Sequence, residues 1–151
     1  MKLETSNEFL RGAIAGSISA FVICLLMEVF ERLGLAKHCW LFMAGQPIMQ
    51  FQHHWPQTMF ALLIHLGVGA FWGIIIAFLF SKWFTDRHYV LKSLVIGSAI
   101  YFLHLGLLFK TLNYPAKMRS ELFTNFLIFV SYLIYGVLTV IIIRKLKPVR
   151  E

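Results

Sequence analysis

Charged residues are scarce in this chain. Only 14% of its 151 residues are Asp, Glu, Lys or Arg, and 59% are hydrophobic, whereas soluble proteins have about a quarter charged and about half apolar residues. The apolar residues are gathered into long blocks, each long enough for the ~20 residues that a membrane-spanning helix needs. The composition therefore excludes an ordinary soluble protein and predicts a single integral membrane domain over residues 1–151.

Cysteine is also rare, and several catalytic patterns are missing. Cys24 and Cys39 do not form a CxxC pair, so we expect neither a structural disulfide nor a dithiol redox enzyme. The zinc-protease pattern HExxH does not occur. The first apolar block lacks a small-residue cleavage site and is too long for a signal peptide. We therefore expect a retained first helix and a protein without enzymatic activity.

Four apolar blocks predict four spanning helices, at about residues 9–33, 58–80, 90–109 and 122–143. A short turn near Asp86 joins the second and third blocks, which would make those two spans antiparallel neighbours, as in an up-down bundle. Residues 34–57 form a long apolar outer loop whose tryptophans suit the membrane interface. The predicted fold is an all-α bundle of four transmembrane helices.

The formal net charge of +7 comes from basic residues that flank the apolar blocks. They do not form a stripe with interleaved aromatic residues, so nucleic acid is not expected as a partner. An even number of spans puts both termini on one side. That side collects nine of the Lys and Arg residues: Lys2, Arg11, Lys82, Arg87, Lys92, Arg144, Lys145, Lys147 and Arg150. The positive-inside rule then predicts cytoplasmic N and C termini in the cytoplasmic (inner) membrane.

Glycines four residues apart predict close helix packing. Gly12-xxx-Gly16 and Gly69-xxx-Gly73 each remove two side chains from one helix face, which lets a neighbouring backbone approach. Gly97 marks a similar surface on the third span. These surfaces could join helices within one chain or between two copies. The expected partners are therefore the lipid bilayer and either a second copy or another membrane protein.

A weak internal echo links the first and third spans. Leu10-Arg11 and Gly16-Ser17 recur at the same spacing as Leu91-Lys92 and Gly97-Ser98. Two stacked hairpins are conceivable on this basis. The fourth span shows no matching echo of the second, however, so chance is the better explanation from the sequence.

Three ionisable residues, Glu28, His65 and His104, lie inside the apolar blocks. Helix-rise arithmetic places each roughly 10 Å from the same membrane face, and ionisable groups in hydrocarbon are costly enough to require an explanation. His65 begins the face that carries Gly69 and Gly73, so we expect it to point into the bundle. His104 shares a face with Gly97, which makes contact between the two imidazoles feasible.

Several roles for these residues stay open. Glu28 precedes Arg32 by four residues, the favourable order for an ion pair within a helix, and the histidines could simply pack in neutral, hydrogen-bonded form. Alternatively, the cluster could serve a small transporter or channel component. A third alternative makes His65 and His104 metal or haem ligands, although no cofactor is the main expectation. Polar residues of the fourth span could extend such an interior: Asn125, Ser131, Tyr132 and Tyr135.

The order of features resembles that of small bacterial membrane proteins of the YqhR-like and YagU-like kind. Four short segments carry the resemblance: Gly12-Ala13-Ile14-Ala15-Gly16, Gln46-Pro47, Leu91-Lys92-Ser93-Leu94-Val95-Ile96-Gly97 and Leu133-Ile134-Tyr135-Gly136. The resemblance implies a four-span protein of the cytoplasmic membrane and brings no established activity with it.

Overall fold

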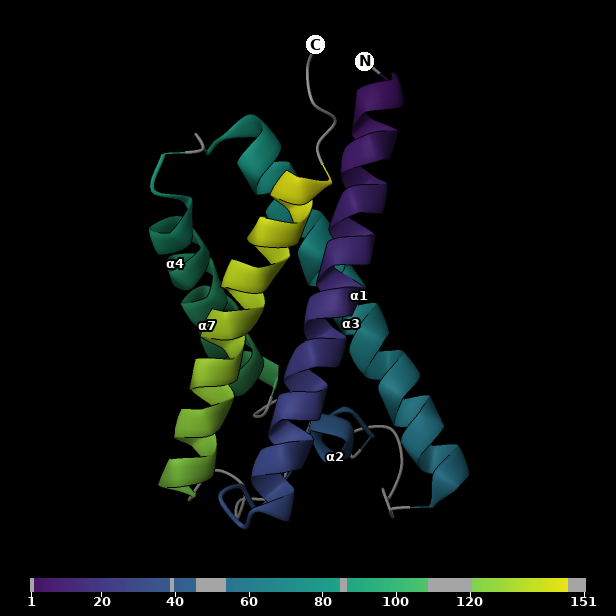
Figure 1. Cartoon of the computed structure of the whole chain (residues 1–151), viewed down its shortest axis with the longest axis vertical. Coiled ribbons are helices and arrows are strands. Elements are labelled where there is room, and N and C mark those ends of the chain that lie inside the picture. The colour runs from purple at the N-terminus through teal and green to yellow at the C-terminus, as the bar shows by residue number, and fades with distance from the viewer. Residues whose placement is uncertain (1, 39, 46–53, 85–86, 109–120, 147–151) are drawn as a thin grey trace.

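The structure, a computed structural model, describes residues 2–38, 40–45, 54–84, 87–108 and 121–146. Its helices are α1 (Lys2–Arg32), α2 (Trp40–Gly45), α3 (Trp55–Lys82), α4 (Tyr89–Phe102), the π-helical segment η1 (Leu103–Leu108) and α7 (Leu122–Lys145). Four stretches are long and apolar enough to cross a membrane: Asn7–Arg32, Trp55–Lys82, Tyr89–Gly106 and Leu122–Lys145. The predicted all-α fold with four candidate spans is confirmed. The start of α1 and the end of α7 lie at the same end of the bundle (Figure 1).

Local sequence explains where several helices begin and end. After α1, Gly34 adopts a φ of 72° and its N–H donates to the carbonyl of Glu31 at 2.9 Å, because glycine enters this left-handed region without steric cost. Pro56 stands in the first turn of α3, where no intrahelical N–H bond is lost. Arg144 and Lys145 occupy the last turn of α7 and complement its dipole.

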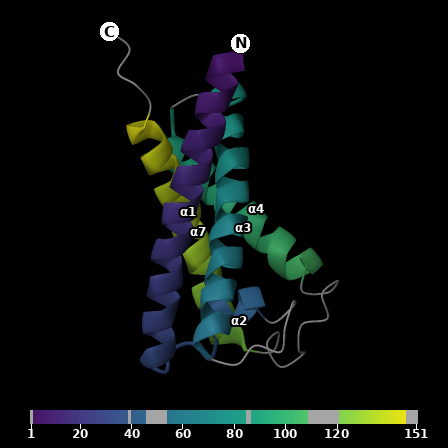
Figure 2. The same ribbon diagram turned by 90° about the vertical axis from the view of Figure 1, so that its right-hand side faces the viewer.

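The four long helices form two packed pairs. α1 packs on α3, α4 packs on α7, and α7 also packs along α1. Figure 2 shows α1 and α3 running side by side while the lower part of α4 leans away from them. The second and third spans touch through the side chains of Trp72 in α3 and His104 in η1, but α3 and α4 make little backbone contact in the described residues, so each packs most closely on another helix. Glycine surfaces, rather than the short turn between these helices, select the partners.

The contact between α1 and α3 depends on glycine from both sides. A Cβ atom on Gly12 would lie 2.6 Å from the Cα of Ile74, and one on Gly73 would lie 2.6 Å from the Cα of Gly16. A Cβ on Gly69 would overlap the side chain of Ala20. Any larger residue at these positions would separate the helices and remove dispersion contacts along the whole crossing. These predicted packing glycines are therefore used within the chain.

The contact between α4 and α7 repeats this arrangement. A Cβ on Gly97 would lie 2.5 Å from the carbonyl oxygen of Tyr132, and one on Gly136 would lie 2.5 Å from that of Ser93 and 3.3 Å from the Cα of Gly97. In the first pair, Gly73 meets Gly12 and Gly16 in the same way. The fourth span thus does echo the second, through Gly136. Only the packing shows this relation, since the sequences flanking the two glycines differ.

Polar contacts close the opposite end of the bundle, after α1 and before α7. The Lys37 ammonium pairs with Glu121 at 2.9 Å, and the backbone N–H of Lys37 donates to the hydroxyl of Thr124 at 3.2 Å. The hydrogen bond from Lys37 holds the pKa of Glu121 below its usual value. Beside these contacts α2 packs on α3 and buries Met43, so part of the predicted apolar loop lies against the bundle. Residues 46–53 of that loop lie outside the described residues.

Two glycines of α3 provide a matched test of the crossing. Gly73→Ala is expected to lower the free energy of unfolding by about 1–3 kcal/mol, because the new methyl would meet the α1 backbone. Gly67→Ala is expected to be neutral or to stabilise by up to about 1 kcal/mol, since nothing lies within 4 Å of that Cβ. Thermal and denaturant unfolding in detergent measure both. Equal stabilities of the two variants would contradict the proposed close contact.

Candidate functional site

Close packing of α1 and α3 brings two backbone carbonyls within reach of polar side chains. His65, which is 8% exposed, places its Nε2 atom 3.0 Å from the carbonyl oxygen of Ala20 in α1. The hydroxyl of Tyr135 in α7 donates to the carbonyl oxygen of Gly69 in α3 at 2.6 Å. A carbonyl only accepts, so Nε2 of His65 carries a proton in this arrangement. Both bonds link different helices and remove polar groups from contact with lipid.

His104 is held between two aromatic residues from different helices. The indole Nε1–H of Trp72 donates to Nε2 of His104 at 3.0 Å, and Nδ1 of His104 is hydrogen-bonded to the hydroxyl of Tyr132. The indole nitrogen only donates, so Nε2 of His104 has to accept and carries no proton. His104 is therefore neutral in this geometry, with its proton on Nδ1 and directed at the Tyr132 oxygen. We call Trp72, His104 and Tyr132 the aromatic triad.

The backbone at His104 departs from regular α-helix. α4 ends at Phe102 and continues as the π-helical segment η1 from Leu103 to Leu108. π-helical turns are rare and occur frequently at functional positions. From this segment the His104 ring contacts α3 and α7 together. The bond from Trp72 to His104 thus joins the two helix pairs, as the bond from Tyr135 to the carbonyl of Gly69 also does.

Of the predicted site residues, the structure brings His104 and Tyr132 into contact. His65 and His104 both lie at contacts between helices, but the hydrogen-bond partners of His104 are Trp72 and Tyr132. Glu28 is not brought to either histidine. Its carboxylate pairs with Arg32 at 2.9 Å on the same helix. It also lies eight residues beyond Ala20, the partner of His65, or about 12 Å by helix rise.

The arrangement does not present the two histidines as a metal or haem pair. His65 uses Nε2 for a backbone carbonyl, and both ring nitrogens of His104 are engaged. A metal at His104 Nε2 would have to displace the Trp72 N–H, leaving that donor unsatisfied in an apolar region. Within the described residues, no group of three or more His, Cys, Asp or Glu could hold a metal ion.

Sequence reasoning named Tyr132 and Tyr135 as possible polar extensions but missed Trp72. A signal for Trp72 was available. Tryptophan in membrane proteins concentrates at the two interfaces, and Trp72 lies near the middle of the 28-residue helix α3. A buried indole N–H usually needs an acceptor, so a tryptophan at this depth predicts a polar partner on a neighbouring helix. The partner itself, His104, depends on the π-helical turn and could not have been identified from the sequence.

Comparison of this chain with models of protein families, with curated proteins and with solved structures found no match.

The Trp72 to His104 bond is testable by a double-mutant cycle. Trp72→Phe keeps an aromatic ring and removes the N–H, and it is expected to cost about 0.6–2 kcal/mol of unfolding free energy. In a His104→Leu background the same change is expected to cost little, because the acceptor is already absent. Equal losses in the two backgrounds would show that the bond does not contribute. Phe60→Leu, at another exposed position of α3, controls for changes at the lipid-facing surface.

Proposed function

We propose that this chain is a non-enzymatic, multi-pass protein of the cytoplasmic membrane with both termini in the cytoplasm. In this proposal the buried polar side chains hold the two helix pairs, α1 with α3 and α4 with α7, in one arrangement. The observation that carries it is the mutual engagement of these groups: His65, Tyr135 and the aromatic triad each bond to another helix. Satisfied polar networks of this kind add rigidity and specify one packing arrangement.

The same proposal includes association with a second copy or with a membrane partner. The glycine surfaces are occupied inside the chain, so such a contact has to use surface that otherwise meets lipid. Among the four candidate spans, the one that contains α4 has the smallest buried share. Val95 and Phe102 of this helix are each more than 60% exposed and lie on one face by helical spacing. We therefore assign this face to partner contact.

A second candidate function is a proton-linked role in a small transporter or channel component. Its support is the tautomer of His104, whose Nε2 atom accepts the indole N–H. Protonation of that nitrogen would turn two donors toward each other and break the contact with Trp72. The π-helical segment that carries His104 adds to this support, because such segments often mark functional positions.

Orientation can be tested with the two native cysteines. Cys39 lies in the predicted outer loop, so a membrane-impermeant maleimide is expected to label it from outside intact cells. Cys24 is 5% exposed inside α1 and is expected to stay unlabelled, which makes it an internal control. Lys145→Cys in a Cys39→Ser background is expected to react only in inverted vesicles. Reaction of Cys39 from the cytoplasmic side alone would reverse the proposed topology.

Substitution of His104 separates the two candidate functions. The structural role predicts that His104→Ala lowers the unfolding midpoint, because it removes the acceptor of Trp72 and the donor to Tyr132. It also predicts that liposomes with the wild-type protein conduct protons no faster than empty liposomes. The proton-linked role instead predicts a wild-type flux that His104→Gln abolishes while the protein remains folded. Phe60→Leu serves as the control variant in both measurements.

A further inference from the structure

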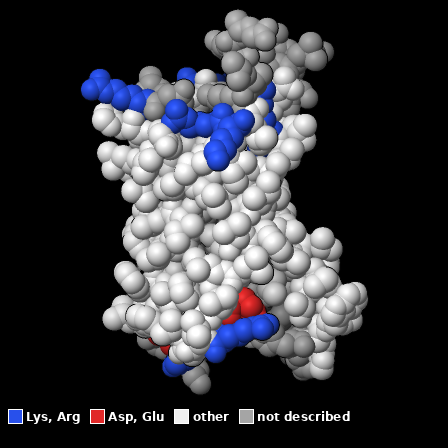
Figure 3. Space-filling model, viewed as in Figure 1, with Lys and Arg blue, Asp and Glu red and all other residues white. Residues whose placement is uncertain are grey.

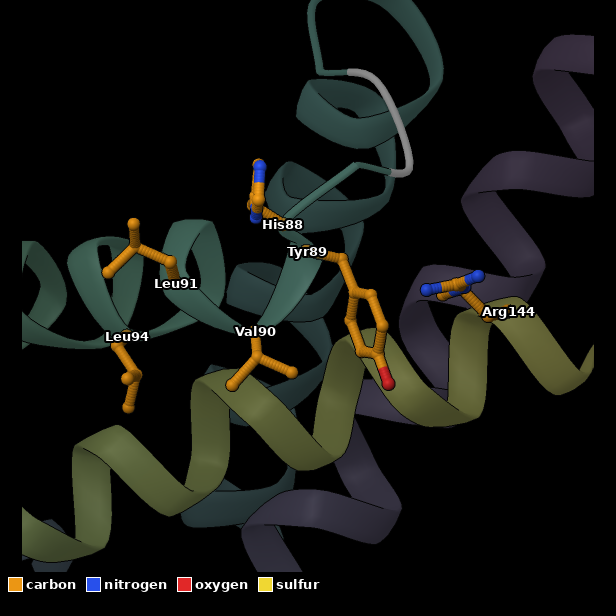
Figure 4. Close-up of a pocket in the computed structure, with 6 residues that line it drawn as sticks. All are labelled: His88, Tyr89, Val90, Leu91, Leu94 and Arg144. Atoms are coloured by element: carbon orange, nitrogen blue, oxygen red, sulfur yellow. The ribbon is translucent and has the colours of Figure 1, made fainter.

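An open groove lies where the start of α4 meets the end of α7 (Figure 4), at the same end of the bundle as the start of α1 (Figure 1). Its volume is about 640 Å³, within the range of small-molecule sites. The lining residues combine polar and aromatic groups with aliphatic ones: His88, Tyr89, Val90, Leu91, Leu94 and Arg144. The groove therefore has two chemical parts that one ligand would have to match.

The polar part centres on Arg144. Its guanidinium lies 4.0 Å from the centre of the Tyr89 ring, and Figure 4 shows Tyr89 standing between the start of α4 and Arg144 of α7. Stacking on an aromatic ring holds the guanidinium plane, while its N–H groups point outward in that plane. This geometry suits the paired oxygens of a phosphate. Among the described residues, the ion pairs do not include one to Arg144.

The surrounding charge favours an anion. Lys and Arg side chains gather at this end of the molecule in Figure 3, where no acidic side chain of the described residues is visible on the face shown. Glu8 lies in α1, the helix that starts at this end, and it is already paired with Arg11 at 3.2 Å. Arg87 and Lys145 are exposed on the elements that border the groove. An anionic group at Arg144 would thus meet positive charge from several neighbours.

The apolar part continues from this charge into the span. Leu91 is 63% exposed and Val90 is 42% exposed, and both follow Tyr89 within the stretch Tyr89–Gly106 that is apolar enough to cross a membrane. Leu94 lies one turn beyond Val90 on the same helix. The groove therefore passes from a cationic rim to aliphatic side chains in the direction in which a lipid passes from headgroup to acyl chain.

We propose that this groove binds an anionic glycerophospholipid. Arg144 holds the phosphate, Tyr89 orients the guanidinium, and Val90, Leu91 and Leu94 contact the upper part of an acyl chain. Basic pockets between membrane helices are known to take such headgroups. The site goes beyond the proposed function, and it does not depend on which leaflet the basic end faces.

The test is a lipid titration of the full-length protein in detergent, followed by native mass spectrometry. Phosphatidylglycerol and phosphatidylcholine with identical acyl chains are compared as probes. Phosphatidylglycerol is expected to bind at least about tenfold more tightly. Arg144→Gln is expected to remove most of this preference, whereas Lys145→Gln, which changes an equal charge on the next residue, is expected to weaken it by no more than about fivefold.

A second pair of variants tests the apolar part without touching the charges. Leu91→Trp is expected to fill the groove and reduce phosphatidylglycerol binding, while Val95→Trp, one turn further along α4 and 62% exposed, is expected to leave it unchanged. Both positions face outward, so neither change should prevent folding. Equal affinity for the two lipids, equal effects of the Arg144 and Lys145 variants, or equal effects of the two Trp variants would each overturn the proposal.

Discussion

The close approach of α1 and α3 across their glycine surfaces is the contact on which the rest of the structure depends. With no side chain between the backbones, the carbonyl groups of Ala20 and Gly69 are accessible to donors from neighbouring helices. His65 and Tyr135 use them. In lipid, where apolar burial does not drive helices together, backbone proximity and such hydrogen bonds supply much of the association energy. The same glycines therefore determine both the packing and the placement of the buried polar groups.

The second helix pair applies the same physical solution, with Gly97 and Gly136 in place of the glycines of the first pair. The two pairs then meet through α7, whose span has the largest buried share of the four. The aromatic triad spans this junction, because Trp72 comes from α3, His104 from η1 and Tyr132 from α7. The neutral tautomer of His104 lets an ionisable residue lie among apolar helices without burying a charge.

Helix partners and the site could be predicted from the sequence to different degrees. The apolar runs located all four candidate spans, and the four-residue spacing identified Gly12, Gly16, Gly69 and Gly73 as packing positions. The choice of partner could not be read from loop length: a short turn favoured pairing of α3 with α4, yet α4 packs on α7. Gly136 was not recognised as a packing residue, although Gly97, which also lacks a second glycine four residues away, was.

The sequence by itself determined the fold class, the number of candidate spans and the surfaces where helices approach closely. These properties follow from hydrophobicity and side-chain size, which are local and additive along the chain. Only the tertiary structure decided that His104 bonds to Trp72 and Tyr132, and that Arg144 borders a groove with Tyr89. Each of these contacts depends on how a helix is rotated about its axis and on which helix lies beside it. A short stretch of residues encodes neither the rotation nor the neighbouring helix.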